Sequence, residues 1–245
     1  LWLPEVIMTY SDRGLGKLSG NFHRVIREHI CRGKWRDKRR PILINNWEAT
    51  YFDFTGERLI TIAREAKKLG IELFVMDDGW FGKRQDDNSG LGDWVPNEQK
   101  LDCTLQELAG RIVAEGMEFG IWLEPESISV DSDLYRSHPE WAVEIPGRRP
   151  CLSRNQLVLD FSRRDVQAYI IETITELLQG IPVTYVKWDF NRAICDKFSG
   201  LLDSGRQGEF SHRYVLGLYS VLETLIENFP EILFEGCCGG GGRFD

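Results

Sequence analysis

The chain has 245 residues, of which 42% are hydrophobic and 28% charged, enough for one large domain with a substantial core. Its 30 Lys and Arg residues against 38 Asp and Glu residues give a net charge of −8, which opposes a broad contact with nucleic acid or an anionic membrane. No run approaches the ~20 apolar residues of a membrane span. Six irregularly spaced cysteines predict neither a disulfide framework nor zinc. We therefore expect a cytoplasmic protein with a neutral partner, no nucleic acid and no membrane.

The ends of the chain and its first 40 residues set the expected domain organisation. The chain begins with Leu1 rather than Met and stops at Asp245 after a glycine run, so we expect a segment of a longer protein. Residues 1–40 carry a basic cluster for which a nucleic-acid patch is one interpretation, but a solvated connector is favoured because the chain is acidic and aromatic residues are few there. The cluster consists of Arg32, Lys34, Arg36, Lys38, Arg39 and Arg40.

From Pro41 onward, short β-rich runs alternate with amphipathic segments. The strand candidates are residues 42–46, 73–77, 119–123, 157–161, 184–188 and 232–235. Two later segments repeat apolar residues at three- and four-residue steps, which predicts helices with one buried face. The apolar face of the first consists of Val166, Tyr169, Ile170, Ile174, Leu177 and Leu178, and that of the second of Val215, Leu218, Tyr219, Leu222, Leu225, Ile226 and Phe229.

Alternating strands and helices predict parallel β/α units, because a parallel connection needs a crossover. No GxGxxG follows the first strand, which disfavours a dinucleotide-binding sheet, and the glycines at 239–242 lack the Lys-Ser/Thr of a phosphate loop. We therefore predict an α/β fold in which residues 1–40 lead into a (β/α)8 TIM-type barrel over residues 41–245. About six of its eight units are expected in this chain, which would end before the barrel closes.

Acids stand after five of the six predicted strands. In a TIM barrel the active site lies at the carboxyl ends of the strands. One carboxylate there is commonly a helix cap, but caps do not account for acids on five strands. The chemistry-bearing residues at these ends are Trp47, Asp77, Asp78, Trp122, Glu124, Glu126, Asp160, Lys187, Asp189, Asn191, Glu235 and Cys237.

The fifth predicted strand places Lys187 and Asp189 on one side and Trp188 on the other, since side chains alternate. A nearby lysine favours an ionised carboxylate, as a nucleophile requires. A simple buried ion pair is the alternative interpretation, and Trp188 is expected in the core.

Paired carboxylates suit two chemistries. One is glycoside hydrolysis by a nucleophile and an acid, and the other is a Mg²⁺ site, here with Asp77, Asp78 and Glu124 as ligands. Tryptophans near the strand ends favour the first, because an indole face packs well on the C–H surface of a sugar. These tryptophans are Trp47, Trp80, Trp94, Trp122 and Trp188.

Seven segments, in order, resemble glycoside hydrolase family 36, the α-galactosidases of the melibiase and raffinose-cleaving type. They are NNWEA (45–49), MDDGWFG (76–82), GDWVPN (92–97), GIWLEPE (120–126), CLSRNQLVLDFS (151–162), KWDFNR (187–192) and EGCCGGGGRFD (235–245). The resemblance implies a retaining exo-α-galactosidase that removes terminal α-linked galactose from melibiose- and raffinose-type oligosaccharides by double displacement. It implies no metal or cofactor, and a longer parent protein that is often a homo-oligomer, a tetramer.

The same resemblance assigns roles residue by residue. Asp189 of KWDFN corresponds to the nucleophile that forms the covalent galactosyl-enzyme. Lys187 and Asn191 would contact sugar hydroxyls. Asp77 and Asp78 would hold the galactose 4- and 6-hydroxyls, which agrees with the strong charge-assisted hydrogen bonds that carboxylates make to hydroxyls.

Five further residues are placed around the sugar by the resemblance. Trp47 and Trp122 would wall the pocket, and Arg154 would reach towards the ring. Cys237 and Gly240 would lie against the 2-position, although a buried packing thiol is an equal interpretation of Cys237.

The family's general acid/base is an aspartate in a Ser-Asp-x-x-Asp motif beyond the GGGGRFD segment, so we expect it past residue 245. Asp245 does not correspond to it, and Glu124 and Glu126 are expected to brace the site by hydrogen bonds. Three alternatives stay open: a transglycosylase of the raffinose-synthase kind, the metal-dependent enzyme, and an inactive barrel fragment of the parent enzyme.

Overall fold

The computed structural model describes residues 6–240, and their contacts separate two units between Arg40 and Pro41. Within the described residues, no helix is both long and apolar enough to cross a membrane. That residues 1–40 are a connector and residues 41–245 a truncated barrel domain stays a prediction. The elements of the first unit are α1 (Gly14–Val25), the π-helical turn η1 (Ile26–Ile30) and the 3-10 turn η2 (Lys34–Arg36).

The basic cluster of the first unit folds around one tryptophan. Trp35 is buried, and the ammonium groups of Lys34 and Lys38 lie 5.0 and 4.5 Å from the centre of its ring. Arg40 donates a hydrogen bond to the carbonyl oxygen of Trp35. Cations stacked on an indole are partly satisfied by its negative face. Part of the cluster therefore has a structural partner within its own unit.

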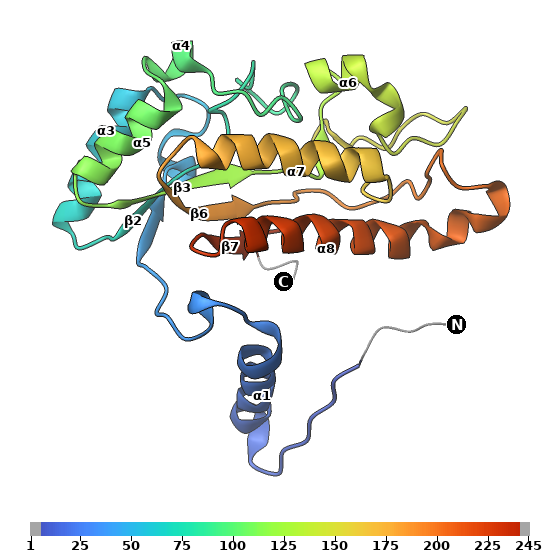
Figure 1. Ribbon diagram of the computed structural model, residues 1–245, viewed down its shortest axis with the longest axis horizontal. Coiled ribbons are helices and arrows are strands. Elements are labelled where there is room, and N and C mark those ends of the chain that lie inside the picture. Colours follow the sequence, from blue (N-terminus) through green and yellow to red (C-terminus); the bar gives the residue numbers. More distant parts are fainter. Residues whose placement is uncertain (1–5, 241–245) are drawn as a thin grey trace. The chain divides into compact units, whose positions relative to one another are not determined.

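The second unit is built on a five-stranded sheet in the order β1-β2-β3-β6-β7, in which every neighbouring pair is parallel (Figure 1). Each crossover carries a helix, as a parallel connection requires. The predicted α/β class with parallel units is thereby confirmed. The strands are β1 (Leu43–Asn45), β2 (Leu73–Met76), β3 (Glu118–Leu123), β6 (Val183–Trp188) and β7 (Leu233–Gly236), and the crossover helices are α3 (Gly56–Lys68), α5 (Leu105–Ala114), α7 (Arg164–Gln179) and α8 (Phe210–Asn228).

Shorter elements decorate the connections. Capping side chains mark where several helices begin: the hydroxyls of Thr55 and Thr104 accept backbone N–H groups at the starts of α3 and α5, and Thr104 forms a capping box with Glu107. The short elements are α2 (Trp47–Thr50), α4 (Glu98–Leu101), α6 (Asp133–Ser137), the 3-10 turns η3 (Pro139–Trp141) and η4 (Ser204–Glu209), and the strands β4 (Ser127–Ile128) and β5 (Leu157–Val158).

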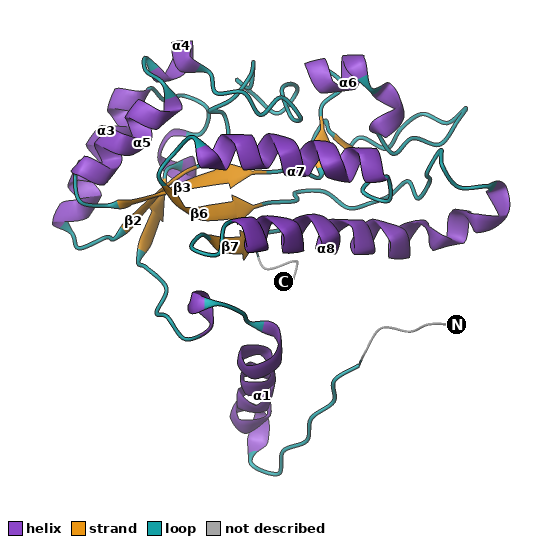
Figure 2. Ribbon diagram, in the orientation of Figure 1, coloured by secondary structure: helices purple, strands orange, loops and turns teal. Residues whose placement is uncertain are grey.

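The expected barrel strand at residues 157–161 is wrong. Leu157 and Val158 form a short strand that pairs antiparallel with β4 in a separate two-stranded ribbon near α6 (Figure 2), and Leu159 makes an isolated bridge with Ala142. Strand β3 pairs directly with β6 instead. The described residues therefore contain five strands of the main sheet rather than six. A buried run of four apolar residues and Asp160 fits a side ribbon as well as a barrel strand, so its pattern could not separate the two.

Alternation along the strands divides the sheet into two faces. Phe74, Met76 and Ile121 pack in the large core that includes the crossover helices. Leu73, Val75 and Tyr185 form a separate small cluster on the opposite face. Continuing the alternation puts a set of residues at the strand ends, or just past them, on the same face as the small cluster. They are Asn45, Asp77, Lys187, Asp189 and Cys237.

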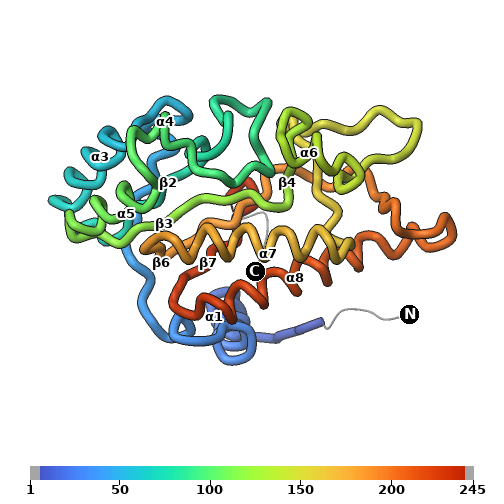
Figure 3. Tube along the Cα trace, turned by 45° about the horizontal axis from the view of Figure 1, so that its top comes forward, coloured from blue at the N-terminus to red at the C-terminus, as the bar shows by residue number. Residues whose placement is uncertain are grey.

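Helices α7 and α8 lie side by side along the sheet (Figure 3). Val166, Ile170, Ile174 and Leu178 are buried in α7, as predicted. In α8 the predicted face is rotated. Val215, Tyr219 and Ile226 are exposed, whereas Leu218 and Leu225 are buried as predicted, and Leu222 and Phe229 pack against the core. The buried face also takes in Phe210, Tyr214, Gly217 and Val221, which were not predicted.

Gly217 explains how α8 reaches its position. A Cβ atom there would lie 1.8 Å from the carbonyl oxygen of Phe161, so the helix approaches this turn with only a hydrogen atom between them. In α5, a Cβ at Gly110 would meet nothing within 4 Å.

We predict that Gly217→Ala destabilises the protein and that Gly110→Ala does not. The first substitution forces α8 away from backbone that cannot yield, with a cost on the order of 2–3 kcal/mol. The second improves helix propensity by roughly 0.5–1 kcal/mol. Thermal unfolding of both variants beside the wild type measures this, and equal unfolding midpoints for the two variants would contradict the packing.

Candidate active site

The first carboxylate at the sheet edge, Asp77, is held from two sides. Its Oδ2 atom accepts hydrogen bonds from Asn45 at the end of β1 and from Lys187 of β6, whose Nζ lies 2.9 Å away. Its backbone N–H donates to Asn46. Burial lowers the pKa of Lys187, but the charge and hydrogen bond of Asp77 outweigh it and hold the pKa above its ordinary value. The lysine therefore remains charged and fixes Asp77.

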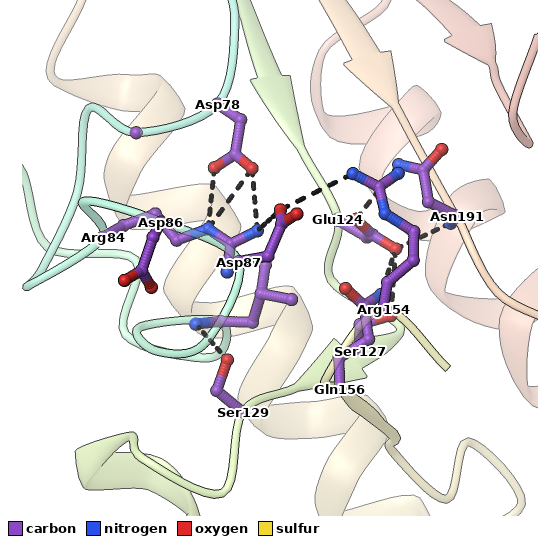
Figure 4. Close-up of polar contacts among 12 residues, drawn as sticks. Asp78, Arg84, Asp86, Asp87, Glu124, Ser127, Ser129, Arg154, Gln156 and Asn191 are labelled. Carbon is purple, nitrogen blue, oxygen red and sulfur yellow. Dashed lines mark hydrogen bonds and ion pairs between the residues drawn. The ribbon is translucent and has the colours of Figure 1, made fainter. Parts of the chain in front are cut away.

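The second carboxylate, Asp78, is paired with an arginine. Arg84 Nε lies 3.0 Å from Asp78 Oδ1 and Arg84 Nη2 lies 2.8 Å from Asp78 Oδ2, a bidentate arrangement in which both side chains are almost fully buried (Figure 4). Burial raises the pKa of Asp78, and the Arg84 guanidinium opposes that shift. Gly79 follows with a φ of +101°, a backbone turn that glycine adopts readily.

The predicted nucleophile, Asp189, stands just past β6 and is 4% exposed. Trp122 Nε1 donates to its Oδ2 at 2.9 Å, and the backbone N–H of Phe190 donates to its Oδ1 at 2.9 Å. One donor on each oxygen fixes the orientation of the carboxylate. Lys187 lies on the same side of the strand, as predicted, but its ion-pair partner is Asp77.

Glu124 ties the site to the long connection that follows β3. It accepts hydrogen bonds from the side chains of Ser127 and Gln156 and from both the backbone and the side chain of Asn191 (Figure 4). Burial raises the pKa of Glu124, the backbone bond from Asn191 lowers it, and the charge of Asp189 raises it further. With its oxygens so occupied, Glu124 acts as a brace between two loops.

Glu126 braces a different layer. Its two oxygens accept from Trp188 Nε1 at 3.0 Å and from the Tyr214 hydroxyl at 2.6 Å, which links β6 to α8. Trp188 is buried, as expected.

Within residues 6–240 no group of three His, Cys, Asp or Glu side chains is arranged to hold a metal ion. The Mg²⁺ ligand set considered from the sequence is therefore not assembled there.

The tryptophans near the strand ends differ in exposure. Trp47 is half-buried and contacts the rings of Tyr51 and Phe52 edge-on. Trp122 is 2% exposed and stacks on Phe81. Trp80 and Trp94 are buried as well. Trp47 is thus the member of the set with an open surface, while Trp122 contacts Asp189 through its N–H group.

The remaining predicted site residues lie on loops. Arg154 is exposed and reaches towards Asp87 (Figure 4). Cys237 is buried, and burial raises the pKa of its thiol to about 11, so it is a protonated, packed group near neutral pH. The backbone N–H of Gly239, beside Gly240, donates to Asn191. Asp245 lies outside the described residues.

Three residues that hold the site were not predicted from the sequence: Asn45, Arg84 and Gln156. Asn45 belongs to the NNWEA segment, where no separate role was predicted for it, and its side chain joins Asp77 to the backbone N–H of Trp47. Arg84 stands six residues after Asp78 and directly after Lys83, a pattern that does not by itself indicate an ion pair. Gln156 carried no signal in its own pattern.

The melibiase family model matches residues 2–245. The chain belongs to the melibiase family. The structure of the GH36 α-galactosidase AgaA from Geobacillus stearothermophilus superposes with a TM-score of 0.94 at 54% identity, covering 96% of this chain and 33% of that one. The resemblance to glycoside hydrolase family 36 is thereby confirmed.

Curated relatives agree with this family assignment. AgaA of Geobacillus stearothermophilus is 54% identical over 99% of this chain, and α-galactosidase Mel36A of Lactobacillus acidophilus is 52% identical over 99%. These relatives are named α-galactosidases, which are glycoside hydrolases. The chain spans about a third of the length of the curated relatives it matches: 33% of each of these two.

Lys100 is a half-buried lysine beside the site, and its pKa is shifted. Its Nζ donates to the carbonyl of Gly79 at 2.8 Å and lies over the ring of Phe54. Burial lowers its pKa to about 8, although the charges of Asp78 and Asp53 act to raise it.

We predict that the protein gains stability from Lys100 as pH rises above 8. Between pH 8 and the unfolded-state pKa of roughly 10.4, the unfolded chain binds the extra proton, so the free energy of unfolding increases with pH. After solvent screening the gain is on the order of 1 kcal/mol. Denaturant unfolding at several pH values should show this slope in the wild type and in Lys68→Met, an exposed control, and lose it in Lys100→Met. A slope that persists in Lys100→Met would contradict the assignment.

Proposed function

We propose that the protein is a retaining exo-α-galactosidase that removes terminal α-linked galactose from raffinose-type oligosaccharides. The observation that carries the proposal is the environment of Asp189: a buried carboxylate with one donor on each oxygen, at the carboxyl edge of a parallel sheet, surrounded by further carboxylates. This is the setting that a nucleophile in double displacement needs.

In the proposed first step, one Asp189 oxygen attacks the anomeric carbon and the bond to the departing sugar breaks. The Trp122 N–H and the Phe190 backbone N–H keep the carboxylate aimed during attack, which contributes through orientation. A carboxylate has about four acceptor positions, so Asp189 still has free lone pairs. Water then hydrolyses the galactosyl-enzyme.

The neighbouring charges suit the hydroxyls of a sugar. Asp77 and Asp78 retain acceptor capacity beyond their bonds to Lys187 and Arg84, and the Lys187 ammonium has donors left after its bond to Asp77. Together the two aspartates and the lysine offer both hydrogen-bond acceptors and hydrogen-bond donors to sugar hydroxyls. Trp47, half-buried at the start of α2, offers an apolar surface to the C–H face of the ring.

Solved relatives support this class of substrate. Variants of AgaA from Geobacillus stearothermophilus have been solved in complex with raffinose and with stachyose. Both are oligosaccharides, in agreement with the raffinose-type substrate proposed here. The general acid/base is expected beyond residue 245, as the family resemblance implies. That group would donate the proton to the departing sugar. Assembly as a tetramer also stays a prediction.

We predict that Asp189→Ala in the full-length protein lowers kcat on an aryl α-galactoside by at least ~10³-fold, because no other group can form the covalent bond. Azide, small enough to enter the space left by the carboxylate, should restore turnover and give β-galactosyl azide.

The matched control is Asp53→Ala, whose carboxylate is 99% exposed and which should keep wild-type rates. Product configuration by NMR separates the outcomes. Near-normal turnover of Asp189→Ala, or an α-configured azide, would show that Asp189 is not the nucleophile of a retaining enzyme.

A further inference from the structure

Asp87 lies between two arginines that come from different loops (Figure 4). Its Oδ1 atom is 3.6 Å from Nη2 of Arg84 and 3.6 Å from Nη2 of Arg154. This oxygen is buried, yet it has no hydrogen-bond partner among the described residues. A buried carboxylate oxygen without a hydrogen bond is costly, so a charge interaction must hold it in place.

The two arginines are constrained very differently. Arg84 is 1% exposed, bound bidentately to Asp78, and donates through Nη1 to the carbonyl of Ser89. Arg154 is exposed, and Asp87 is the one carboxylate within 4 Å of its guanidinium in the part of the chain that the structure describes. The four side chains form a row of alternating charge, Asp78–Arg84–Asp87–Arg154, anchored at the Asp78 end.

The backbone under Arg154 adds a second constraint. Arg154 and Asn155 have φ angles of +54° and +57°, and the N–H of Gln156 donates to the carbonyl of Ser153 at 3.3 Å. This is a two-residue turn of the type I′ form, in which a non-glycine residue at the first position is strained. The turn presents the Arg154 side chain, and its contact with Asp87 sets where the guanidinium lies.

We propose that Asp87 is a positioning residue that holds Arg154 at the mouth of the galactoside site, a role that rests on the proposed function. Without the Asp87 charge, two guanidinium groups would face each other with no anion between them. Arg84 cannot leave because it is buried and bound to Asp78. Arg154 would therefore swing into solvent, and its contribution to sugar binding would be lost.

The test is Asp87→Asn in the full-length protein, with Asp86→Asn as the matched control. Asp86 sits in the same loop and loses the same charge, but it is exposed, and its carboxylate accepts a hydrogen bond from the Asn88 backbone and is not an ion-pair partner of either arginine. Asp87→Asn should raise KM for an aryl α-galactoside roughly 5- to 30-fold with kcat within about twofold, the size expected for a lost charge-assisted contact. Asp86→Asn should change neither.

A double variant separates positioning from general loosening of the structure. In an Arg154→Gln background, Asp87→Asn should have no further effect on KM, because Asp87 acts through Arg154. An equal rise in KM in both backgrounds, or a fall in kcat alone, would overturn the proposal.

Chemical modification gives a readout that does not need activity. Phenylglyoxal should modify Arg154 several-fold faster in Asp87→Asn than in Asp86→Asn or the wild type, measured by peptide mass spectrometry. An unchanged rate would overturn the positioning role whether or not the wild type hydrolyses galactosides. An inactive wild type with the faster modification would instead remove only the proposed function.

Discussion

The site depends on burying several negative charges at one edge of a sheet. Carboxylates brought this close repel one another and lose hydration, so each must have its own compensating group. Lys187 supplies it for Asp77 and Arg84 for Asp78, both as ion pairs. Glu124 and Asp189 rely on N–H and O–H donors. Removing one partner would leave a buried charge, at a cost on the order of 3–5 kcal/mol.

The long connection between β3 and β6 adds loops to this edge without changing the sheet. It runs through the β4–β5 ribbon and α6 before α7 returns the chain to the sheet. Glu124 joins this connection, through Gln156, to Asn191 after β6. Arg192 reinforces the same junction by donating to the carbonyls of Cys151 and Gln156. The turn that carries Arg154 is therefore fixed at its base while its tip remains exposed.

Sequence periodicity predicted what depends on local geometry. Parallel units, the buried face of α7 and the common side of Lys187 and Asp189 all follow from alternation or helical spacing. The partners of a side chain on other strands do not follow from spacing, because spacing predicts which side of a strand a side chain is on and not how far it lies from residues of other strands. Lys187, for example, pairs with Asp77, although β3 lies between their strands. For the same reason, residues 157–161 were wrongly predicted as a strand of the main sheet, and the pairing of Arg84 with Asp78 was not predicted. Site roles came from the resemblance to family 36, and they stay predictions.

The central claim is that Asp189 bonds to the sugar. A 5-fluoro-galactosyl fluoride slows hydrolysis of the intermediate more than its formation, so the full-length protein should accumulate a covalent adduct. Peptide mass spectrometry should place a single fluorogalactosyl group on Asp189, between Trp188 and Phe190. A label on Asp77, Asp78 or Glu124, or continued turnover with no label, would contradict the account.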